Sequence, residues 1–188
     1  MRGCSHTARL LPIAREDLDS VLIGGRERRA IVIAEYDDEW PARFARERDR
    51  VVAALGPAAV RVEHFGSTAV PGLAAKPIVD VLITVPDPED DGPFVALLET
   101  AGYELRVREP GHRMFRTPAR DVHVHVWADD DPEVDRCLRF RDRLRASPED
   151  RSAYERLKRE LARRQWPDMN DYADAKTDLV DEILGRAD

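Results

Sequence analysis

The sequence contains few cysteines and no long hydrophobic run. Its two cysteines, Cys4 and Cys137, lie far apart and lack the close spacing of metal-binding or disulfide-rich proteins. No hydrophobic run approaches the roughly 18–20 residues that a membrane-spanning helix needs. The N-terminus also lacks the long apolar core of a secretory signal. We therefore expect a cytoplasmic protein with reduced thiols and no membrane partner.

The chain also lacks a surplus of positive charge. Lysines and arginines number 30 against 37 aspartates and glutamates, which gives a net charge of -7. This balance argues against non-specific binding to nucleic acids, which requires a basic surface, although it leaves room for a local basic patch. With 188 residues, of which 43% are hydrophobic, the chain is long enough for one domain with a sizeable core.

The residues most informative about function lie in one stretch, Glu63–Val85, which reads EHFGSTAVPGLAAKPIVDVLITV. The alternating run Val60–Phe65 predicts a strand, and the small residues Gly66–Thr68 predict a turn after it. A second apolar run, Ile78–Val85, is long enough for a strand buried on both faces. The stretch therefore predicts two core strands, the first followed directly by a glycine-containing turn.

The turn and the second strand carry the side chains of a nucleotide and metal site. Gly66 lets backbone N–H groups approach a phosphate closely, and the hydroxyls of Ser67 and Thr68 add hydrogen-bond donors. Lys76 supplies a cation. Asp80 interrupts the second apolar run, where an ionised carboxylate is costly unless it is paired or bound to a cation. The alternative for Asp80 is a structural role, paired with Lys76 or an arginine, or accepting from N–H groups of a loop.

The segment GSTAVPGLAAKPIVDV resembles the signature of the GrpB family, a branch of the nucleotidyltransferase superfamily. Further segments resemble the same family in the same order: EYDDEWPARF, HRMFR, HVHV, Tyr154 with Leu157-Lys158, and Tyr172 with Lys176. The resemblance covers about Ile31–Leu184. It implies a nucleotidyltransferase-like α+β fold, in which a mixed β-sheet has flanking helices and a helical C-terminal part.

The resemblance also implies roles for single residues. In nucleotidyltransferases a Gly-Ser turn after the first core strand binds the triphosphate, and carboxylates on the next strand hold Mg²⁺. The corresponding residues are Gly66 and Ser67 for phosphate and Asp80 for the metal, with Ser67 and Asp80 as the catalytic candidates. One departure concerns the reaction, because the superfamily pattern has a second carboxylate where this chain has Leu82. Without an Asp-x-Asp pair, two-metal nucleotidyl transfer is in doubt.

The strand predicted over Val122–Trp127 offers a second group of candidates. Its valines point to one face, and His123 and His125 point to the other, about 7 Å apart along the strand. The resemblance places this run where the superfamily has a further carboxylate, and neutral imidazole suits Zn²⁺, Mn²⁺ or Ni²⁺ better than Mg²⁺. We predict that Asp80, His123 and His125 bind a divalent metal, Mg²⁺ or Mn²⁺, with Zn²⁺ as the alternative. In the structural alternative, the histidines only make hydrogen bonds on a polar strand face.

Five basic residues are candidates for binding phosphate: Lys76, Arg113, Arg116, Lys158 and Lys176. The two arginines lie on or beside a predicted strand, and planar guanidinium groups bind phosphates in a bidentate manner. Lys158 and Lys176 lie in the predicted C-terminal helices, which carry cations to the nucleotide phosphates in related nucleotidyltransferases. Each follows a tyrosine by four residues, so that ring and charge share one helix face. The alternatives are solvated lysines and arginines and tyrosines that belong to the core. For His64, just before the turn, we favour a buried histidine that is hydrogen-bonded to the backbone.

The remaining pattern places strands and helices first and helices last. Helices are expected at about 38–55, 94–101, 132–145, 148–164 and 171–185, and further strands at about 31–34, 103–107 and 114–117. This order is typical of an α+β domain whose helical C-terminal part closes a cleft. We assign residues 31–188 to that domain and residues 1–30 to an N-terminal extension, mobile or separately docked.

Two functions are compatible with these residues. The first is an enzyme that transfers a nucleotidyl group from a nucleoside triphosphate to an unknown acceptor, in which Lys158 or Lys176 neutralises the leaving pyrophosphate. The second is a non-catalytic module that binds a nucleotide or another phosphorylated small molecule, which is consistent with Leu82. Since the GrpB domain can be joined to a dephospho-CoA kinase in other members of the family, the resemblance also implies a link to coenzyme A metabolism. The sequence predicts neither the acceptor, nor the base, nor the oligomeric state.

Overall fold

The chain folds around one five-stranded β-sheet. The structure, a computed structural model, describes residues 18–27, 30–92 and 94–186. Its strands are β1 (Arg61–Phe65), β2 (Val79–Val85), β3 (Glu104–Glu109), β4 (His112–Arg116) and β5 (Val122–Ala128). Their order across the sheet is β1-β2-β5-β4-β3, with β2 and β5 parallel and the other neighbouring pairs antiparallel. This mixed sheet and its helices confirm the predicted α+β class.

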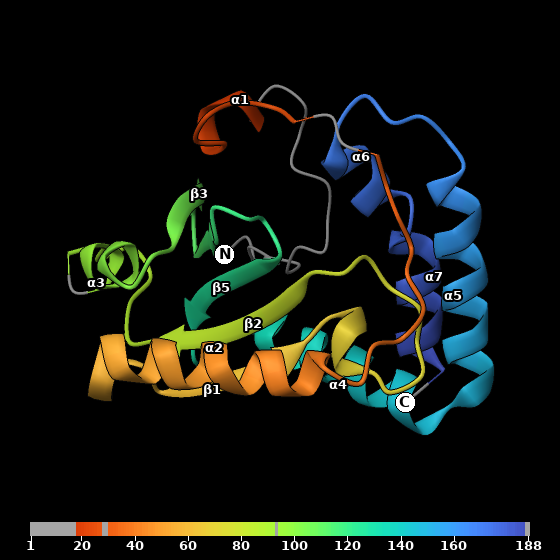
Figure 1. Ribbon diagram of the computed structural model, residues 1–188, viewed down its shortest axis with the longest axis horizontal. Coiled ribbons are helices and arrows are strands. Elements are labelled where there is room, and N and C mark those ends of the chain that lie inside the picture. Colours follow the sequence, from red (N-terminus) through yellow and green to blue (C-terminus); the bar gives the residue numbers. More distant parts are fainter. Residues whose placement is uncertain (1–17, 28–29, 93, 187–188) are drawn as a thin grey trace, which may run out of the picture.

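Helices lie on both faces of the sheet and at one end of it (Figure 1). They are α1 (Leu18–Val21), α2 (Trp40–Leu55), α3 (Val95–Thr100), α4 (Pro132–Ala146), α5 (Pro148–Ala162), α6 (Met169–Asp174) and α7 (Thr177–Gly185), with short 3₁₀ turns at Gly56–Ala58 and Ser67–Ala69. Helices α2 and α3 cover one face, α4 lies against the other, and α5, α6 and α7 stand together beside the sheet. No helix in the described part of the chain is both long and apolar enough to cross a membrane.

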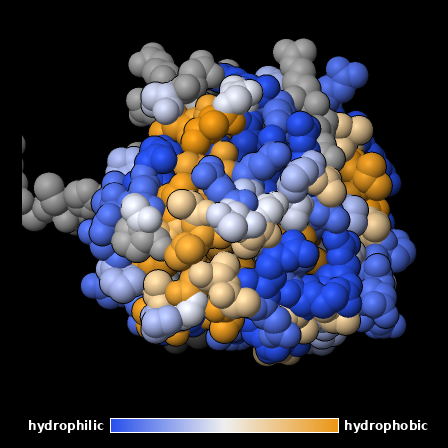
Figure 2. Space-filling model, turned by 60° about the vertical axis from the view of Figure 1, so that its left-hand side comes forward, coloured by the Kyte–Doolittle hydropathy of each residue, from blue (hydrophilic) through white to orange (hydrophobic). Residues whose placement is uncertain are grey.

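The face toward α2 and α3 holds the main hydrophobic core. The alternating valines of β5, namely Val122, Val124 and Val126, point into this core, as their pattern predicted. Trp40 at the start of α2 packs there with 1% of its surface exposed. On the side of the molecule that carries α3, the surface combines a hydrophobic area with a large hydrophilic one (Figure 2). Because the main core fills the face of the sheet toward α2 and α3, polar functional residues of the strands are expected on the opposite face.

One row of residues crosses the whole sheet. Phe65, Asp80, His123, Arg116 and Glu104 lie opposite one another in the strand register, in that order. Residues paired in this way point to the same face of a sheet. That face is the one away from the main core, so the register places Asp80 and His123 side by side next to α4.

The structure corrects two predicted elements. Residues 31–34 do not form a strand, because only Ala34 pairs, and its partner Ala75 lies in the loop between β1 and β2. The helix predicted over 171–185 is two helices, α6 and α7. Asp168 caps α6, its carboxylate accepting from two backbone N–H groups, so that this helix begins earlier than predicted and ends before Lys176.

The predicted N-terminal extension, residues 1–30, lies partly outside the described residues, which exclude 1–17 and 28–29. In the described part, Leu22 forms a β-bridge with Val107 of β3. The N–H of Ile23 donates to the carbonyl of Arg106 at 2.9 Å. Residues 22–27 therefore run beside the outer strand of the sheet, and the division of the chain at residue 30 stays a prediction.

Candidate functional site

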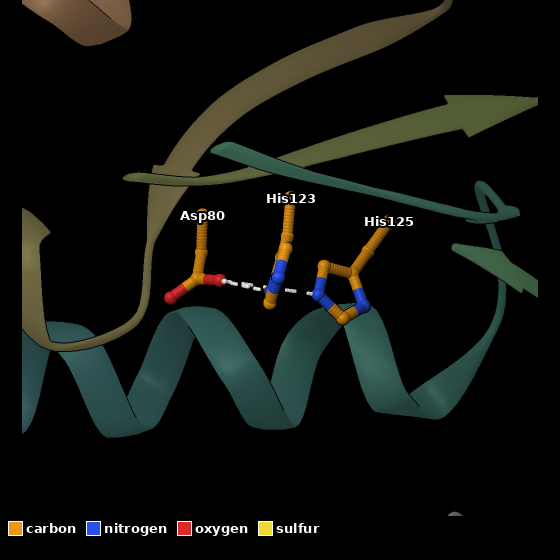
Figure 3. A group of neighbouring side chains, drawn as sticks. All are labelled: Asp80, His123 and His125. Atoms are coloured by element: carbon orange, nitrogen blue, oxygen red, sulfur yellow. Dashed lines mark ion pairs between the residues drawn. The ribbon is translucent and has the colours of Figure 1, made fainter. Parts of the chain in front are cut away.

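The three predicted metal ligands, Asp80, His123 and His125, lie together on one face of the sheet (Figure 3). We name these three residues the metal-binding group. Asp80 lies on β2 and the histidines lie on β5, and all three side chains point toward α4. Asp80 Oδ1 is 3.5 Å from His123 Nδ1 and 4.0 Å from His125 Nε2. One donor atom of each residue lies within 4.8 Å of the other two. The structure thus brings the three predicted ligands together, and metal binding itself stays a prediction.

Burial and neighbouring charges together determine the pKa values of Asp80 and His125. Burial raises the pKa of Asp80, but the hydrogen bond and charge of His123 outweigh it, with help from His125 and Lys76, so the pKa lies below its ordinary value. Burial, followed by the charge of His112, holds the pKa of His125 well below its ordinary value. At neutral pH the group therefore contains a carboxylate and a neutral imidazole, which are the protonation states that bind metal ions.

A hydrogen-bonded chain that the sequence analysis missed orients His125. His112 of β4 has its Nδ1 2.6 Å from Glu109 Oε1 and its Nε2 3.0 Å from His125 Nδ1. A carboxylate only accepts, so His112 donates from Nδ1; in its neutral form His112 then accepts at Nε2, and His125 donates from its own Nδ1. The lone pair of His125 Nε2 is then left free on the side of Asp80, as a metal ligand requires. The signal in the sequence was the position of His112 at the start of the HRMFR segment, just before a predicted strand.

Leu82 lies two residues after Asp80 on β2 and is fully buried. It packs with Trp127, Val134 and Cys137 in a hydrophobic cluster under α4. The position that carries a second carboxylate in the superfamily pattern is therefore part of the core in this chain. Of the described residues, Asp80 alone supplies a carboxylate to the group of three possible metal ligands.

Gly66 follows β1 directly, and its conformation requires glycine. Its φ of 69° and ψ of -170° lie in a region that is almost confined to glycine. A Cβ atom at this position would also collide with the carboxylate of Asp80. Gly66 therefore lets the Ser67–Ala69 turn pass close to the metal-binding group.

Lys158 of α5 reaches the same turn. Its ammonium group donates to Ser67 Oγ at 3.0 Å and to the carbonyl of Ala74 at 2.5 Å, and it lies 5.0 Å from the ring centre of Tyr154. Only 3% of Lys158 is exposed. Burial and then the charge of Lys176 lower the pKa of Lys158 to about 7. The buried amino group of Lys158 is thus held against the hydroxyl that the sequence predicted to bind phosphate.

Two further lysines lie over the ring of Tyr172. Lys76 Nζ is 5.1 Å and Lys176 Nζ is 4.5 Å from the ring centre. Burial and then the charge of Lys76 lower the pKa of Lys176 to about 7, although Asp80 acts in the opposite direction. Together with Lys158, these residues place three of the five predicted cations beside the glycine turn and the metal-binding group.

Thr68 turns its hydroxyl away from this group. The hydroxyl donates to the carbonyl of Ile78 at 3.1 Å and lies 3.1 Å from His64 Nε2, from which it accepts. His64 is buried and stacks on Phe44 of α2, and burial lowers its pKa to about 4. His64 is therefore buried, as we favoured, but its ring bonds to the hydroxyl of Thr68 and not to the backbone. The predicted hydroxyl donor of Thr68 is already engaged.

Arg113 lies apart from the other predicted cations. It pairs in register with Val126, so it points to the face of the main core. There its guanidinium donates to Asp91 Oδ1 at 2.9 Å and to Glu89 Oε2 at 3.1 Å. The geometry therefore ties Arg113 to the loop before α3 and separates it from the predicted phosphate site.

Two cavities adjoin the residues around Asp80. The larger has a volume of about 430 Å³ and is lined by His123 and Arg116 as it extends over β5 and β4. The smaller has a volume of about 140 Å³ and lies between Ser67, Lys176 and hydrophobic side chains of α4 and α7. Space for ligands is thus present on both sides of the metal-binding group.

The donor set indicates which metal would fit. Two imidazole nitrogens and one carboxylate oxygen suit Zn²⁺ or Mn²⁺, whereas Mg²⁺ prefers an octahedral set of oxygen ligands. The Glu109–His112–His125 chain is also of the kind that orients metal-binding histidines in proteins. The residues present therefore fit a divalent transition metal, and Mg²⁺ less well.

Known proteins resemble this chain over most of its length. The model of the family described as "GrpB protein" matches residues 30–186. A UPF0157 protein of Streptomyces coelicolor is 52% identical over 174 residues, which cover 92% of this chain and 93% of that protein. The crystal structure of the conserved protein GrpB from Enterococcus faecalis matches with a TM-score of 0.72 at 34% identity, over 83% of this chain and 96% of that one. A dephospho-CoA kinase of Mycolicibacterium paratuberculosis is 31% identical over 189 residues, 85% of this chain and 46% of that protein.

Proposed function

The chain belongs to the GrpB family, and from this premise we propose that it binds a nucleoside triphosphate with a divalent metal and transfers a nucleotidyl group to an acceptor. One observation carries the proposal: the glycine turn is packed so closely on Asp80 that a Cβ at Gly66 would meet the carboxylate. A phosphate held by this turn would therefore lie next to the metal-binding group, as transfer at phosphorus requires.

Each group of residues has a part in this proposal. Ser67 and the backbone N–H groups of the turn hold phosphate oxygens, and Lys158 and Lys176 neutralise the charge of the leaving pyrophosphate. Asp80 and the two histidines hold the metal. When bound, a metal at this position polarises the phosphoryl oxygens and neutralises their charge.

A second candidate function is supported by Leu82. Its side chain is buried among hydrophobic residues, where a second metal-binding carboxylate could not be accommodated without repacking. A module that binds a nucleotide or another phosphorylated molecule without turning it over would use the same lysines and the same turn. The relation to a dephospho-CoA kinase makes dephospho-CoA and coenzyme A suitable ligands for this comparison.

The proposal is tested by replacing Asp80 with asparagine, which keeps the shape of the side chain and removes its charge. We expect the wild type to bind Mn²⁺ and Zn²⁺ and to release pyrophosphate from a nucleoside triphosphate. Asp80→Asn should lose most of its affinity for both metals and should release no pyrophosphate from any nucleoside triphosphate. Calorimetric titration measures the metal affinity, and a pyrophosphate assay with the four nucleoside triphosphates measures turnover. Asp49→Asn is the matched control, because Asp49 is an exposed residue of α2.

The possible results separate the two candidate functions. Binding of nucleotide, dephospho-CoA or coenzyme A by the wild type without pyrophosphate release would favour the binding module. Equal metal affinities in the wild type and Asp80→Asn would exclude Asp80 as a ligand.

A further inference from the structure

The larger cavity leads from His123 across β4 to the described N-terminal segment. Its volume of about 430 Å³ is in the range of small-molecule sites. Three arginines line it: Arg106 from β3, Arg116 from β4, and Arg120 from the turn before β5. Arg106 and Arg116 are largely buried and Arg120 is partly exposed. Buried guanidinium ions are costly to hold together unless an anion accompanies them.

One carboxylate of the chain, Glu27, takes the place of that anion. Arg116 binds both of its oxygens, with Nη1 3.1 Å from Oε2 and Nη2 3.0 Å from Oε1. Arg120 Nη1 also donates to Glu27 Oε2, at 3.2 Å. Planar, two-pronged binding of this kind is how arginine recognises carboxylates and phosphates in ligands.

Arg106 binds mainly backbone carbonyl groups, whereas Arg116 and Arg120 bind the carboxylate of Glu27. Its guanidinium donates to the carbonyl oxygens of Ile23 and Gly25, and it reaches Glu27 only at 4.0 Å. Arg106 therefore fastens the segment that carries Glu27 to β3. Arg116 and Arg120 are left as the pair that binds the anionic group.

The backbone at Arg120 supports a specific role for its side chain. Its φ of 60° makes it the one non-glycine residue in the described part of the chain with a left-handed φ. Strained conformations of this kind persist where the surrounding structure over-determines them, and they cluster at active sites and ligand clamps. Here the strained turn brings the guanidinium of Arg120 into the cavity beside Arg116.

The other carboxylates that line the cavity have partners elsewhere. Asp121 accepts from Arg43 at 2.7 Å and from the hydroxyl of Thr117 at 2.7 Å. Asp168 caps α6 through backbone N–H groups. No ion pair joins either of them to Arg116 or Arg120. Glu104 Oε2 lies 3.9 Å from Arg116 Nε, so among the described residues Glu27 is the carboxylate that contacts both arginines.

The strand register shows where this arginine pair lies relative to the proposed reaction. Along one face, Phe65 precedes the phosphate-binding turn, and Asp80, His123 and Arg116 follow on successive strands. In the proposed reaction, pyrophosphate leaves toward Lys158 and Lys176, on the side of Asp80 that carries the glycine turn. Arg116 lies on the other side of Asp80, beyond His123. In phosphoryl and nucleotidyl transfer, the attacking and leaving oxygens lie roughly in line, so the acceptor has to enter from the side of Arg116.

We infer that Arg116 and Arg120 form the acceptor subsite, and that the acceptor is a small molecule with a carboxylate or phosphate group and a reactive hydroxyl. In the transfer, the hydroxyl oxygen bonds to the α-phosphorus and the bond to the bridging oxygen breaks. Pyrophosphate leaves with that electron pair, and the hydroxyl proton passes to solvent. Glu27 occupies the subsite until the acceptor replaces it. The identification of the ligand as an acceptor rests on the proposed function.

The test measures anion binding at the arginines directly. Acetate and inorganic phosphate are titrated into ¹⁵N-labelled Glu27→Gln protein, and the side-chain Nε–H signals of Arg116 and Arg120 are followed by NMR. We expect both signals to shift in a saturable manner, at anion concentrations about tenfold lower than in the wild type. In the wild type the Glu27 carboxylate competes with the added anion, and a tenfold change corresponds to the loss of one charge-assisted hydrogen bond. The anion that saturates at the lower concentration identifies the group, carboxylate or phosphate, that the subsite prefers.

Matched variants give the result its meaning. Adding Arg116→Gln to Glu27→Gln should abolish saturation, and adding Arg48→Gln, at an exposed position on α2, should leave it unchanged. Glu27→Ala repeats the titration with the side chain removed entirely. The inference is overturned if neither anion gives saturable shifts in either Glu27 variant, even where nucleotide binding is intact. Saturation in a protein that binds no nucleotide would overturn the acceptor role as well as the proposed function, and would leave an anion site of another kind.

Discussion

A single hydroxyl group joins the turn after β1 to the C-terminal helices. Ser67 Oγ accepts a hydrogen bond from Lys158, and the hydroxyl of Ser67 is also the group predicted to donate a hydrogen bond to a phosphate. We expect Ser67→Ala to weaken nucleotide binding about tenfold to hundredfold, since one hydrogen bond to a charged group contributes roughly 1.5–3 kcal/mol. Calorimetric titration of nucleoside triphosphates measures the change, and Ser152→Ala on the exposed surface of α5 is the control. Unchanged affinity in Ser67→Ala would remove this residue from the phosphate site.

His112 acts on the metal only through His125. Replacing it with phenylalanine keeps a ring that can stack on Trp127, 4.5 Å away in the wild type, and removes the acceptor for His125 Nδ1–H. We expect His112→Phe to weaken Zn²⁺ or Mn²⁺ binding about 10- to 100-fold, which is typical for loss of a residue that orients a ligand. The ¹⁵N shifts of His125 in the metal-free protein should change as well, because its tautomer is no longer fixed. A purely structural His112 would leave those shifts as they are.

At the scale of elements, the junction between β1 and the Ser67–Ala69 turn tolerates no side chain. We expect Gly66→Val to lose both nucleotide and metal binding, more completely than Ser67→Ala, because its Cβ would push against the Asp80 carboxylate. Gly72→Val is the matched control: Gly72 also has a left-handed φ, 75°, but nothing within 4 Å of an added Cβ. Thermal unfolding separates the strain common to both variants from the collision present in one. If the two variants bound ligands equally well, close packing on Asp80 would not matter for function.

The elements also show what a sequence can reveal. The alternation of valine and histidine over β5 predicted both its faces, and the apolar run of β2 predicted a buried strand with one misplaced carboxylate. These patterns are local, and they were sufficient to bring Asp80, His123 and His125 together once the strands became neighbours.

Contacts between distant segments were not predictable in this way. The Glu109–His112–His125 chain depends on which residues of β4 and β5 face each other, and the pairing of Glu27 with Arg116 joins residues of the N-terminal segment to β4. Nothing in the spacing of these residues along the chain indicates such contacts. For the same reason Arg113 and Arg116 were grouped together, although residues in their positions point to opposite faces of the sheet.

At the scale of the whole molecule, an acidic chain concentrates cations in one place, and this should make ligand binding depend on pH. Lys158 and Lys176 have pKa values lowered to about 7 from an ordinary value of 10.5. Between these pH values the unfolded chain binds more protons than the folded one, so the free energy of unfolding of the ligand-free protein should rise with pH. A bound phosphate favours the charged ammonium groups, so its affinity should fall as the pH rises above about 7.

Two measurements check this expectation. Chemical denaturation between pH 7 and 10 follows stability, and calorimetry in buffers with different ionisation enthalpies detects the protons taken up when phosphate binds. The double variant Lys158→Met/Lys176→Met should lose both dependences. Affinity that stays constant from pH 6 to 9 in the wild type would contradict the lowered pKa values.

The parallel pairing of β2 with β5 also bears on how the protein folds. Parallel strands cannot be joined by a tight turn, and here α3, β3 and β4 all lie between the two partners in the chain. Pairs such as β3 with β4 are local and close quickly, whereas contacts between distant segments have to overcome a larger loss of chain entropy first. Asp80 and His123 face each other only across that late, non-local contact. The side chains on which any metal or nucleotide chemistry depends therefore come together only when this non-local pair of strands forms, and not with the local hairpin of β3 and β4.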